Sequence, residues 1–323
     1  MVINRRALIA GAPLLLAAPG VARAQAYPSR PVRVIAPFPP GGALDAVSRK
    51  IAQKLSEQMG QQFFVENRTG ATGTIGMGEA ARSAPDGLTL LAMDSTYPMV
   101  GTVFRRLSWD HEHGFAGITD TAWSPSVLVV RADAPWPDLP AFLADARAHP
   151  EQRIYGSGGI GSVLHFFAEG LAQAARVKFF HVPYRGAGDA MTGLLSRAVE
   201  FSVAPTPATI EHVRGGTMRA LALTGPRRSA LLPQVPTFAE QGLPEFSPVY
   251  WTGLGAPAGT PAAIIARLQQ EVARAMQADD MKAFLTAQVA EPGGSPTETY
   301  AKLVRDETVH WREVAAQAGI EPQ

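Results

Sequence analysis

The sequence predicts an α/β protein of two lobes, and three observations support this prediction. Short apolar segments rich in β-branched residues alternate with segments whose apolar residues recur at helical spacing, which is typical of parallel βαβ units. Glycine-rich turns stand where a strand passes into a helix. Two apolar, extended segments, 122–134 and 246–256, flank the middle of the chain. They favour two strand-like crossovers between the lobes.

Composition excludes several functional classes. The 323 residues are 46% hydrophobic and 18% charged, which suits a globular chain long enough for two domains. The absence of cysteine excludes disulfides, thiolate nucleophiles and cysteine-ligated metals. A formal net charge of +1 gives no strong positive electrostatic potential that would attract nucleic acid. We therefore expect no nucleic-acid partner.

Residues 1–26 read as a cleaved signal peptide. Arg5 and Arg6 precede an apolar run, 7–22, and small residues follow at the spacing of a cleavage site. The run contains two prolines and is shorter than the ~20 apolar residues needed to span a bilayer, which argues against an anchor. The arginine pair leaves Sec and twin-arginine export both open. Without this segment the chain has 26 basic and 28 acidic residues, a net charge of −2. We expect the mature protein to be soluble outside the cytoplasm.

The first part of the mature chain predicts alternating strands and helices. Apolar residues at Val47, Ile51 and Leu55 have helical spacing, and Gly60 is a suitable stop, so a helix is predicted over 43–59. Strands are predicted at 32–38, 63–65 and 88–93, with a short helix at 79–83 after a glycine-rich loop, 67–78.

The middle of the chain repeats this alternation, and the tail is helical. Strands are predicted at 127–130, 153–155, 178–182, 199–203 and 219–224, with helices between them, including 139–148 and one through Phe167 and Leu171. Thr260-Pro261 begins a predicted helix that runs to Met276. A capping box, Ser295-Pro296-Thr297-Glu298, begins another that ends near Gly319. The predicted division is 27–125 with 251–323 as lobe I, and 126–250 as lobe II.

Glycine-rich turns at helix starts supply the candidate chemistry. They occur at Gly41-Gly42, at 70–74 and at 159–162, with a fourth candidate at 186–188. The free backbone N–H groups and the positive dipole end of a helix start favour an anion. In an open α/β sheet such turns lie at the carboxyl ends of strands, where ligands bind. Their recurrence in both lobes predicts a shared anion site between them.

A dinucleotide site is the first alternative. Gly156-x-Gly158-x-x-Gly161 matches the nucleotide-binding pattern literally, after a strand and before a helix. That pattern also needs an acidic residue on the next strand to bind the ribose. The next strand, 178–183, has none. We therefore expect no cofactor.

The residues that could form a catalytic site also match known catalytic motifs poorly. Ser157 or Ser162 with His165 would be a nucleophile and base, which leaves a secreted serine hydrolase as the enzymatic alternative. The G-x-S-x-G elbow is absent, because position 155 is tyrosine. The stretch 111–113, His-Glu-His, lacks a third metal ligand in the sequence nearby. We expect neither a catalytic residue nor a metal site.

The sequence resembles a known family along essentially the whole mature chain. The matching segments are 27–31 (YPSRP), 37–45 (PFPPGGALD), 65–71 (VENRTGA), 84–91 (APDGLTLL), 181–186 (HVPYRG), 219–222 (RALA), 235–242 (VPTFAEQG) and 256–261 (APAGTP). They resemble the Bug family, the substrate-binding proteins of tripartite tricarboxylate transporters.

The resemblance implies a fold and a function. It implies a periplasmic, type II venus-flytrap binding protein with an αβα sheet in each lobe and a ligand cleft between the lobes. Such a monomer captures a small carboxylate and delivers it to a membrane transporter of one large and one small subunit. A ligand-binding component of a sensory system is the alternative. The resemblance implies no enzymatic step.

The resemblance also implies ligand-binding positions. They are Phe38, Gly41, Gly42, Ala43, Leu44, Asp45, Ala71, Thr72, Ser157, Gly159, Ile160, Gly161 and Ser162, with Ser95, Ala204 and Pro205 as weaker matches. Two positions depart from the family pattern: Leu44 replaces a small hydroxyl residue, and Ala204 replaces an acid. If both faced the cleft, the ligand would be less polar beyond its carboxylate than citrate.

Overall fold

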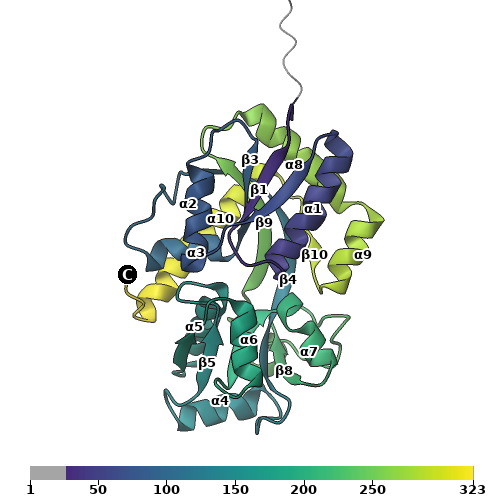
Figure 1. The fold of residues 1–323 in the computed structure, drawn as a ribbon. Coiled ribbons are helices and arrows are strands. Elements are labelled where there is room, and N and C mark those ends of the chain that lie inside the picture. The colour runs from purple at the N-terminus through teal and green to yellow at the C-terminus, as the bar shows by residue number, and fades with distance from the viewer. Residues whose placement is uncertain (1–26, 323) are drawn as a thin grey trace, which may run out of the picture.

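The computed structural model describes residues 27–322, which form two lobes, one above the other (Figure 1). The predicted signal peptide, residues 1–26, lies outside the described residues. The lobes share one mixed sheet with the strand order β2-β1-β3-β9-β4-β7-β5-β6, while β8 and β10 also pair with β4. The predicted α/β class with two lobes is confirmed.

Lobe I has helices on both faces of its sheet. Its strands are β1 (Val32–Ala36), β2 (Phe63–Asn67), β3 (Thr89–Asp94), β9 (Val249–Pro257), β10 (Glu291–Pro292) and the first part of β4 (Phe115–Arg131). One face packs against α1 (Ala43–Met59), α8 (Ala262–Met276) and α9 (Asp279–Ala287). The other packs against α2 (Thr74–Ala81), α3 (Thr96–Val103) and α10 (Thr297–Gln317). β1 is parallel to β2 and β3, as the βαβ pattern predicts.

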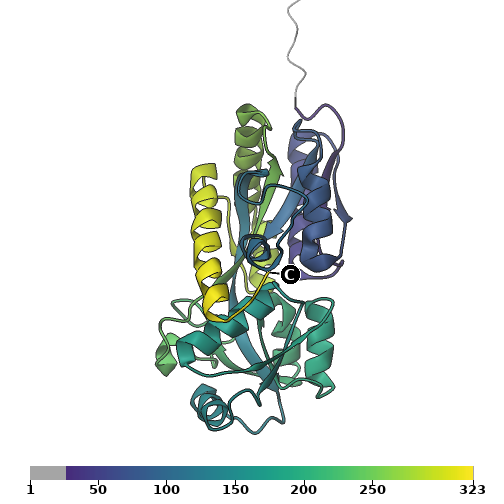
Figure 2. The same ribbon diagram turned by 90° about the vertical axis from the view of Figure 1, so that its left-hand side faces the viewer.

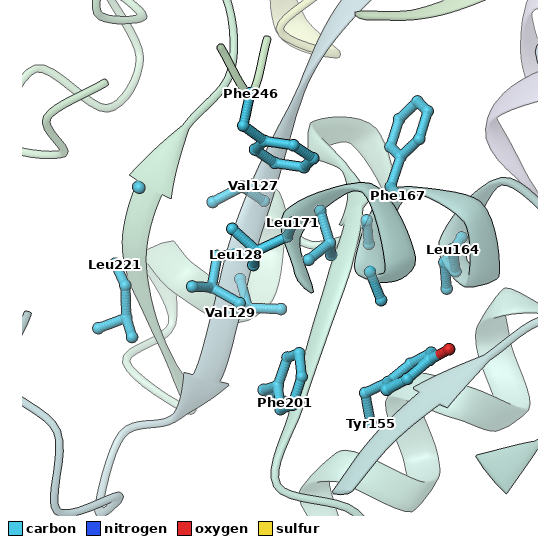
Figure 3. Close-up of a cluster of buried hydrophobic side chains, with 14 of the residues drawn as sticks. Val127, Leu128, Val129, Tyr155, Leu164, Phe167, Leu171, Phe201, Leu221 and Phe246 are labelled. Carbon is cyan, nitrogen blue, oxygen red and sulfur yellow. The ribbon is translucent and has the colours of Figure 1, made fainter. Parts of the chain in front are cut away.

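Lobe II is built on the second part of β4. Its other strands are β5 (Ile154–Ser157), β6 (Phe180–Pro183), β7 (Phe201–Pro205) and β8 (Met218–Leu223), and its helices are α4 (Leu139–Ala148), α5 (Val163–Ala175), α6 (Ala187–Leu195) and α7 (Ile210–Arg214). Figure 3 shows its core, where α5 residues such as Leu171 face Val127–Val129 of β4 and Phe201 of β7.

Two antiparallel strands join the lobes. β4 is continuous for 17 residues, pairing with β9 in lobe I and with β7 and β8 in lobe II. β9 returns beside it, with Trp123 opposite Trp251. The predicted crossovers correspond to these strands. The proposed lobe boundaries, 125/126 and 250/251, therefore fall within strands and not at a flexible linker.

The last helix contacts both lobes. α10 lies along lobe I and its C-terminal end reaches lobe II (Figure 2). There the Trp311 ring packs against Phe166 and Phe167 of α5, with ring centroids 5.8 and 5.5 Å apart. The Gln173 side chain also donates to the carbonyl of Val314 over 2.8 Å. The C-terminal end of α10 therefore forms a further contact between the two lobes.

Some element ends differ from the sequence predictions. α2 begins at Thr74, five residues before the predicted start. The predicted capping box does not form. Pro296, and not Ser295, is the N-cap of α10, and the Ser295 amide that Glu298 would bind donates to Asp120 Oδ1 over 2.9 Å. The helix over 43–59 is confirmed, and Gly60 ends it in the left-handed conformation with φ = 69°.

Candidate functional site

Three loops at the carboxyl ends of parallel strands meet where the lobes face each other. The first loop (37–42) follows β1, the second loop (68–73) follows β2, and the third loop (158–162) follows β5. The first and second loops touch, since a Cβ on Gly73 would lie 3.2 Å from the Phe38 ring. The second and third loops are joined by a hydrogen bond from the Thr72 hydroxyl to the carbonyl of Ile160, 2.9 Å long. The structure therefore brings predicted residues of both lobes together.

The Asp45 side chain anchors the first loop through hydrogen bonds. Its carboxylate accepts hydrogen bonds from the Gly41 amide (3.0 Å), Asn67 Nδ2 (2.8 Å) and Arg49 Nε (3.0 Å). Burial opposes ionisation, but the hydrogen bonds from Arg49, Gly41 and Asn67 together keep the pKa of Asp45 below its usual value. The Asn67 side chain also donates to the carbonyl of Phe38 over 3.0 Å. Asp45 thus orders the loop and has its own oxygens already occupied.

The start of α1 leaves backbone donors free. Its N-cap is Gly42, with extended φ and ψ of −77° and 169° and no capping side chain. Within the described chain, the amides of Gly42, Ala43 and Leu44 donate to no protein acceptor. Gly41 and Gly42 are exposed. Free N–H groups at a helix start, with the helix dipole behind them, suit a carboxylate.

The second loop is held in an uncommon backbone conformation. Four consecutive residues have positive φ: Gly70 (125°), Ala71 (47°), Thr72 (53°) and Gly73 (87°). For Thr72, a β-branched residue, this is costly, of the order of 1–3 kcal/mol. Strain of this kind tends to collect at ligand-binding loops. Here it turns the Thr72 hydroxyl toward lobe II.

The third loop is tied to the protein at three of its amides. The Gly159 amide donates to Ser157 Oγ (3.2 Å), the Gly161 amide to His165 Nδ1 (3.2 Å) and the Ser162 amide to the carbonyl of Gly159 (3.1 Å). In the described chain the amides of Gly158 and Ile160 have no protein acceptor. They are further candidate donors to an anion.

The geometry of the predicted nucleophile and base does not support hydrolysis. Ser162 Oγ accepts the backbone N–H of His165 as a helix cap, and the His165 ring accepts from Gly161 instead of facing that hydroxyl. Ser157 Oγ lies 2.6 Å from Nε2 of His181, a pairing that sequence spacing did not suggest. Ser157 is fully buried below the third loop. No group of three or more acidic or histidine side chains within residues 27–322 is placed to hold a metal ion.

Four predicted positions do not present a side chain between the lobes. Leu44 is 4% exposed and packs in a lobe I core cluster, while Ala204 is fully buried in the lobe II core. Ser95 Oγ accepts the amide of Trp251 over 2.9 Å, and Pro205 is buried in β7 opposite Ser126. The sequence-based expectation that Leu44 and Ala204 make the ligand less polar therefore loses its basis.

Comparison with known proteins identifies the family. A family model described as the tripartite tricarboxylate transporter family receptor matches residues 47–320. The chain belongs to this family. The predicted resemblance is thereby confirmed, and the family is periplasmic. No helix within residues 27–322 is long and apolar enough to cross a membrane.

Three relatives are similar to this protein over most of its length. BugT of Bordetella pertussis is 33% identical, with 98% of this chain and 99% of BugT covered. An R. palustris protein solved with adipate is 31% identical with a TM-score of 0.86, covering 92% of this chain and 100% of that one. MatC of Rhodopseudomonas palustris, solved with malate, is 30% identical with a TM-score of 0.83, covering 89% of this chain and 99% of that one.

Proposed function

We propose that this family receptor is exported to the periplasm, captures a small carboxylate between its lobes and delivers it to a tripartite tricarboxylate-type membrane transporter. The observation that carries the proposal is the placement of free backbone donors on both sides of the lobe junction. Gly42, Ala43 and Leu44 supply them from lobe I, and Gly158 and Ile160 from lobe II. The Thr72–Ile160 hydrogen bond holds the two sides together.

A carboxylate fits these donors by its chemistry. The site offers several free backbone N–H groups, some of them at a helix start, so it favours a compact anion that accepts several hydrogen bonds. The binding of adipate and malate by two solved relatives is consistent with this class. Binding needs no covalent step, because closure of the lobes around the ligand is enough to retain it.

A ligand panel with matched neutral analogues tests the proposal. Residues 27–323 are purified and screened by thermal shift against adipate, malate, citrate and benzoate, together with their amides. We expect at least one acid to raise Tm while its amide does not, because only a ligand that binds the native state stabilises it. The bound acid should be recovered unchanged. Equal shifts with acid and amide, or a converted product, would reject carboxylate capture.

Delivery to a transporter needs a cellular test. Cells lacking the gene should lose uptake of the isotope-labelled acid found in the panel, and the intact gene should restore it. Normal uptake in the deletion strain would separate ligand capture from transport and would reject the delivery step.

A further inference from the structure

A stack of three aromatic side chains lies beneath the third loop. The rings of His165 and His181 are 4.1 Å apart and nearly parallel, and Tyr155 stacks on His181 at 4.8 Å. The register of β5 and β6 produces this stack, because Tyr155 stands directly opposite His181. His165 comes from the first turn of α5 and is 5% exposed. The proposed ligand contacts do not use either histidine.

Each histidine is bonded to a different part of the loop. His165 Nδ1 accepts the Gly161 amide, so that nitrogen carries no proton and the proton of the neutral ring is on Nε2. His181 Nε2 lies 2.6 Å from Ser157 Oγ. The same hydroxyl contacts both the amide and the carbonyl of Gly159, at 3.2 and 3.1 Å. The pair thus fixes Gly159 and Gly161, the two residues on either side of Ile160.

The stack is neutral at the pH of the periplasm. Burial lowers the pKa of His165 to about 3, with the neighbouring His181 adding to the shift, and burial lowers the pKa of His181 to about 4. The other titratable groups packed against the stack are Tyr155 and, through its hydroxyl, Glu169 at 2.6 Å. Burial raises the pKa of Glu169, and its carboxyl accepts the Tyr155 hydroxyl and no histidine N–H within the described chain.

We propose that His165 and His181 are positioning residues for the third loop: as neutral acceptor and hydroxyl partner they hold Gly161 and Gly159, and so aim the amides of Gly158 and Ile160 at the ligand carboxylate. This role rests on the proposed function for the identity of the ligand but not for the contacts themselves. Preorganised donors bind an anion better than donors that must first be ordered. Neither histidine need touch the ligand.

The contacts can be tested without any ligand. In protein labelled with ¹⁵N, an N–H···N hydrogen bond transmits a scalar coupling between the Gly161 amide nitrogen and His165 Nδ1. The imidazole ¹⁵N shifts should report an unprotonated Nδ1 on His165, and a neutral His181 ring. Absence of the coupling in the wild-type spectrum, or a protonated His165 Nδ1, would overturn the proposal. Because this measurement uses no variant, it cannot fail through misfolding.

Two variants of each histidine separate the ring from its nitrogen. His165→Phe keeps the stacked ring but removes the acceptor, whereas His165→Asn loses the ring and retains an acceptor near the Nδ1 position. His181→Phe and His181→Gln form the same pair for the contact with Ser157. His149→Asn, which changes an exposed histidine at the C-terminal end of α4, is the matched control. We expect the amide shifts of Gly158 and Ile160 to move in both Phe variants and to return toward wild type in His165→Asn and His181→Gln.

Affinity for adipate and malate supplies the functional readout. Loss of one buried acceptor is expected to weaken binding about tenfold in His165→Phe, with recovery to within about threefold in His165→Asn. Equal losses in the two variants would assign the effect to the ring and reject positioning through the nitrogen. If neither acid binds the wild-type protein, the proposed function is in question, while the coupling and the loop amide shifts still decide this inference.

Discussion

The Thr72 hydroxyl donates to the carbonyl of Ile160 over 2.9 Å, and this bond joins a strained loop of lobe I to a glycine-rich loop of lobe II. A Cβ on Gly159 would also lie 3.4 Å from Thr72 Oγ1. The contact therefore sits among the donors that we assign to the ligand. Separation of the lobes must break it, so its energy favours the closed arrangement.

Thr72→Val is expected to weaken carboxylate binding about three- to tenfold, because one inter-lobe hydrogen bond is worth about 0.5–1.5 kcal/mol. Valine keeps the β-branched shape, so the backbone strain at Thr72 should not change. Thr192→Val, which removes an exposed hydroxyl bond within α6, is the control. Calorimetric titration measures the affinities. Equal affinities in wild type and Thr72→Val would show that the bond contributes nothing to closure.

Gly42→Asp should abolish binding and leave the fold intact. The extended backbone at Gly42 suits an N-cap aspartate, and an added Cβ meets no atom closer than 3.9 Å, so Tm should hold or rise slightly. A fixed carboxylate beside the bound one costs about 4 kcal/mol at close range, which is a loss of more than a hundredfold. Gly42→Asn has the same shape without the charge and should lose much less. Similar losses in both variants would indicate a steric effect alone.

Gly161→Ala should disturb the lobe contact. Gly161 has φ = 82°, and an added Cβ would lie 2.4 Å from Cγ2 of Val103 on α3, so either α3 or the third loop must move. Gly60→Ala is the matched control, because its φ is 69° but nothing lies within 4 Å. Unfolding in urea should show a loss of about 1 kcal/mol for the control and about 2–4 kcal/mol for Gly161→Ala. Equal losses of stability in the two variants would mean that α3 or the third loop moves aside at no energetic cost.

Glu307→Gln should stabilise the protein at alkaline pH. The Glu307 carboxylate accepts from Nε1 of Trp251 (3.0 Å) and of Trp311 (3.2 Å), and burial raises its pKa to about 7. A carboxyl with a raised folded pKa binds more protons in the native state, so the free energy of unfolding falls as pH rises from about 4.5 to about 7. The variant should match wild type near pH 4 and exceed it by about 1–3 kcal/mol at pH 8.

Urea unfolding at pH 4, 6 and 8 measures this difference, and tryptophan fluorescence of the folded protein should titrate near pH 7 in wild type only. A pH-independent difference between the two proteins would contradict a buried, titrating Glu307. Glutamine retains an oxygen that can accept from both indole N–H groups. The two proteins therefore differ in the charge at position 307 and not in the loss of these hydrogen bonds.

The sequence predicted what depends on neighbours along the chain. Helix α1 and its end at Gly60 followed from apolar spacing and one glycine. The start of α2 was missed, because Thr74–Ala81 is rich in small residues and has little apolar periodicity. The capping box before α10 was overridden by a tertiary contact, because the Ser295 amide donates to Asp120 and not to Glu298 of its own helix.

The site was predicted in its loops but not in the direction of its side chains. Leu44 and Asp45 were both assigned to the ligand from a motif, yet one packs in the core and the other is saturated by hydrogen bonds. His181 lies 24 residues from Ser157, and only strand pairing brings them together. Register between strands is set by the whole sheet, so spacing along the chain could not reveal this contact.

The unbroken course of β4 through both lobes has a consequence for folding. The β4 residues that pair with β9 are followed directly by those that pair with β7 and β8, so unfolding of either half frays the strand on which the sheet of the other half ends. The lobes should therefore melt in a single cooperative step despite their separate cores. Movement between them, for the same reason, must be an elastic bending and twisting of paired strands and not rotation about a free joint.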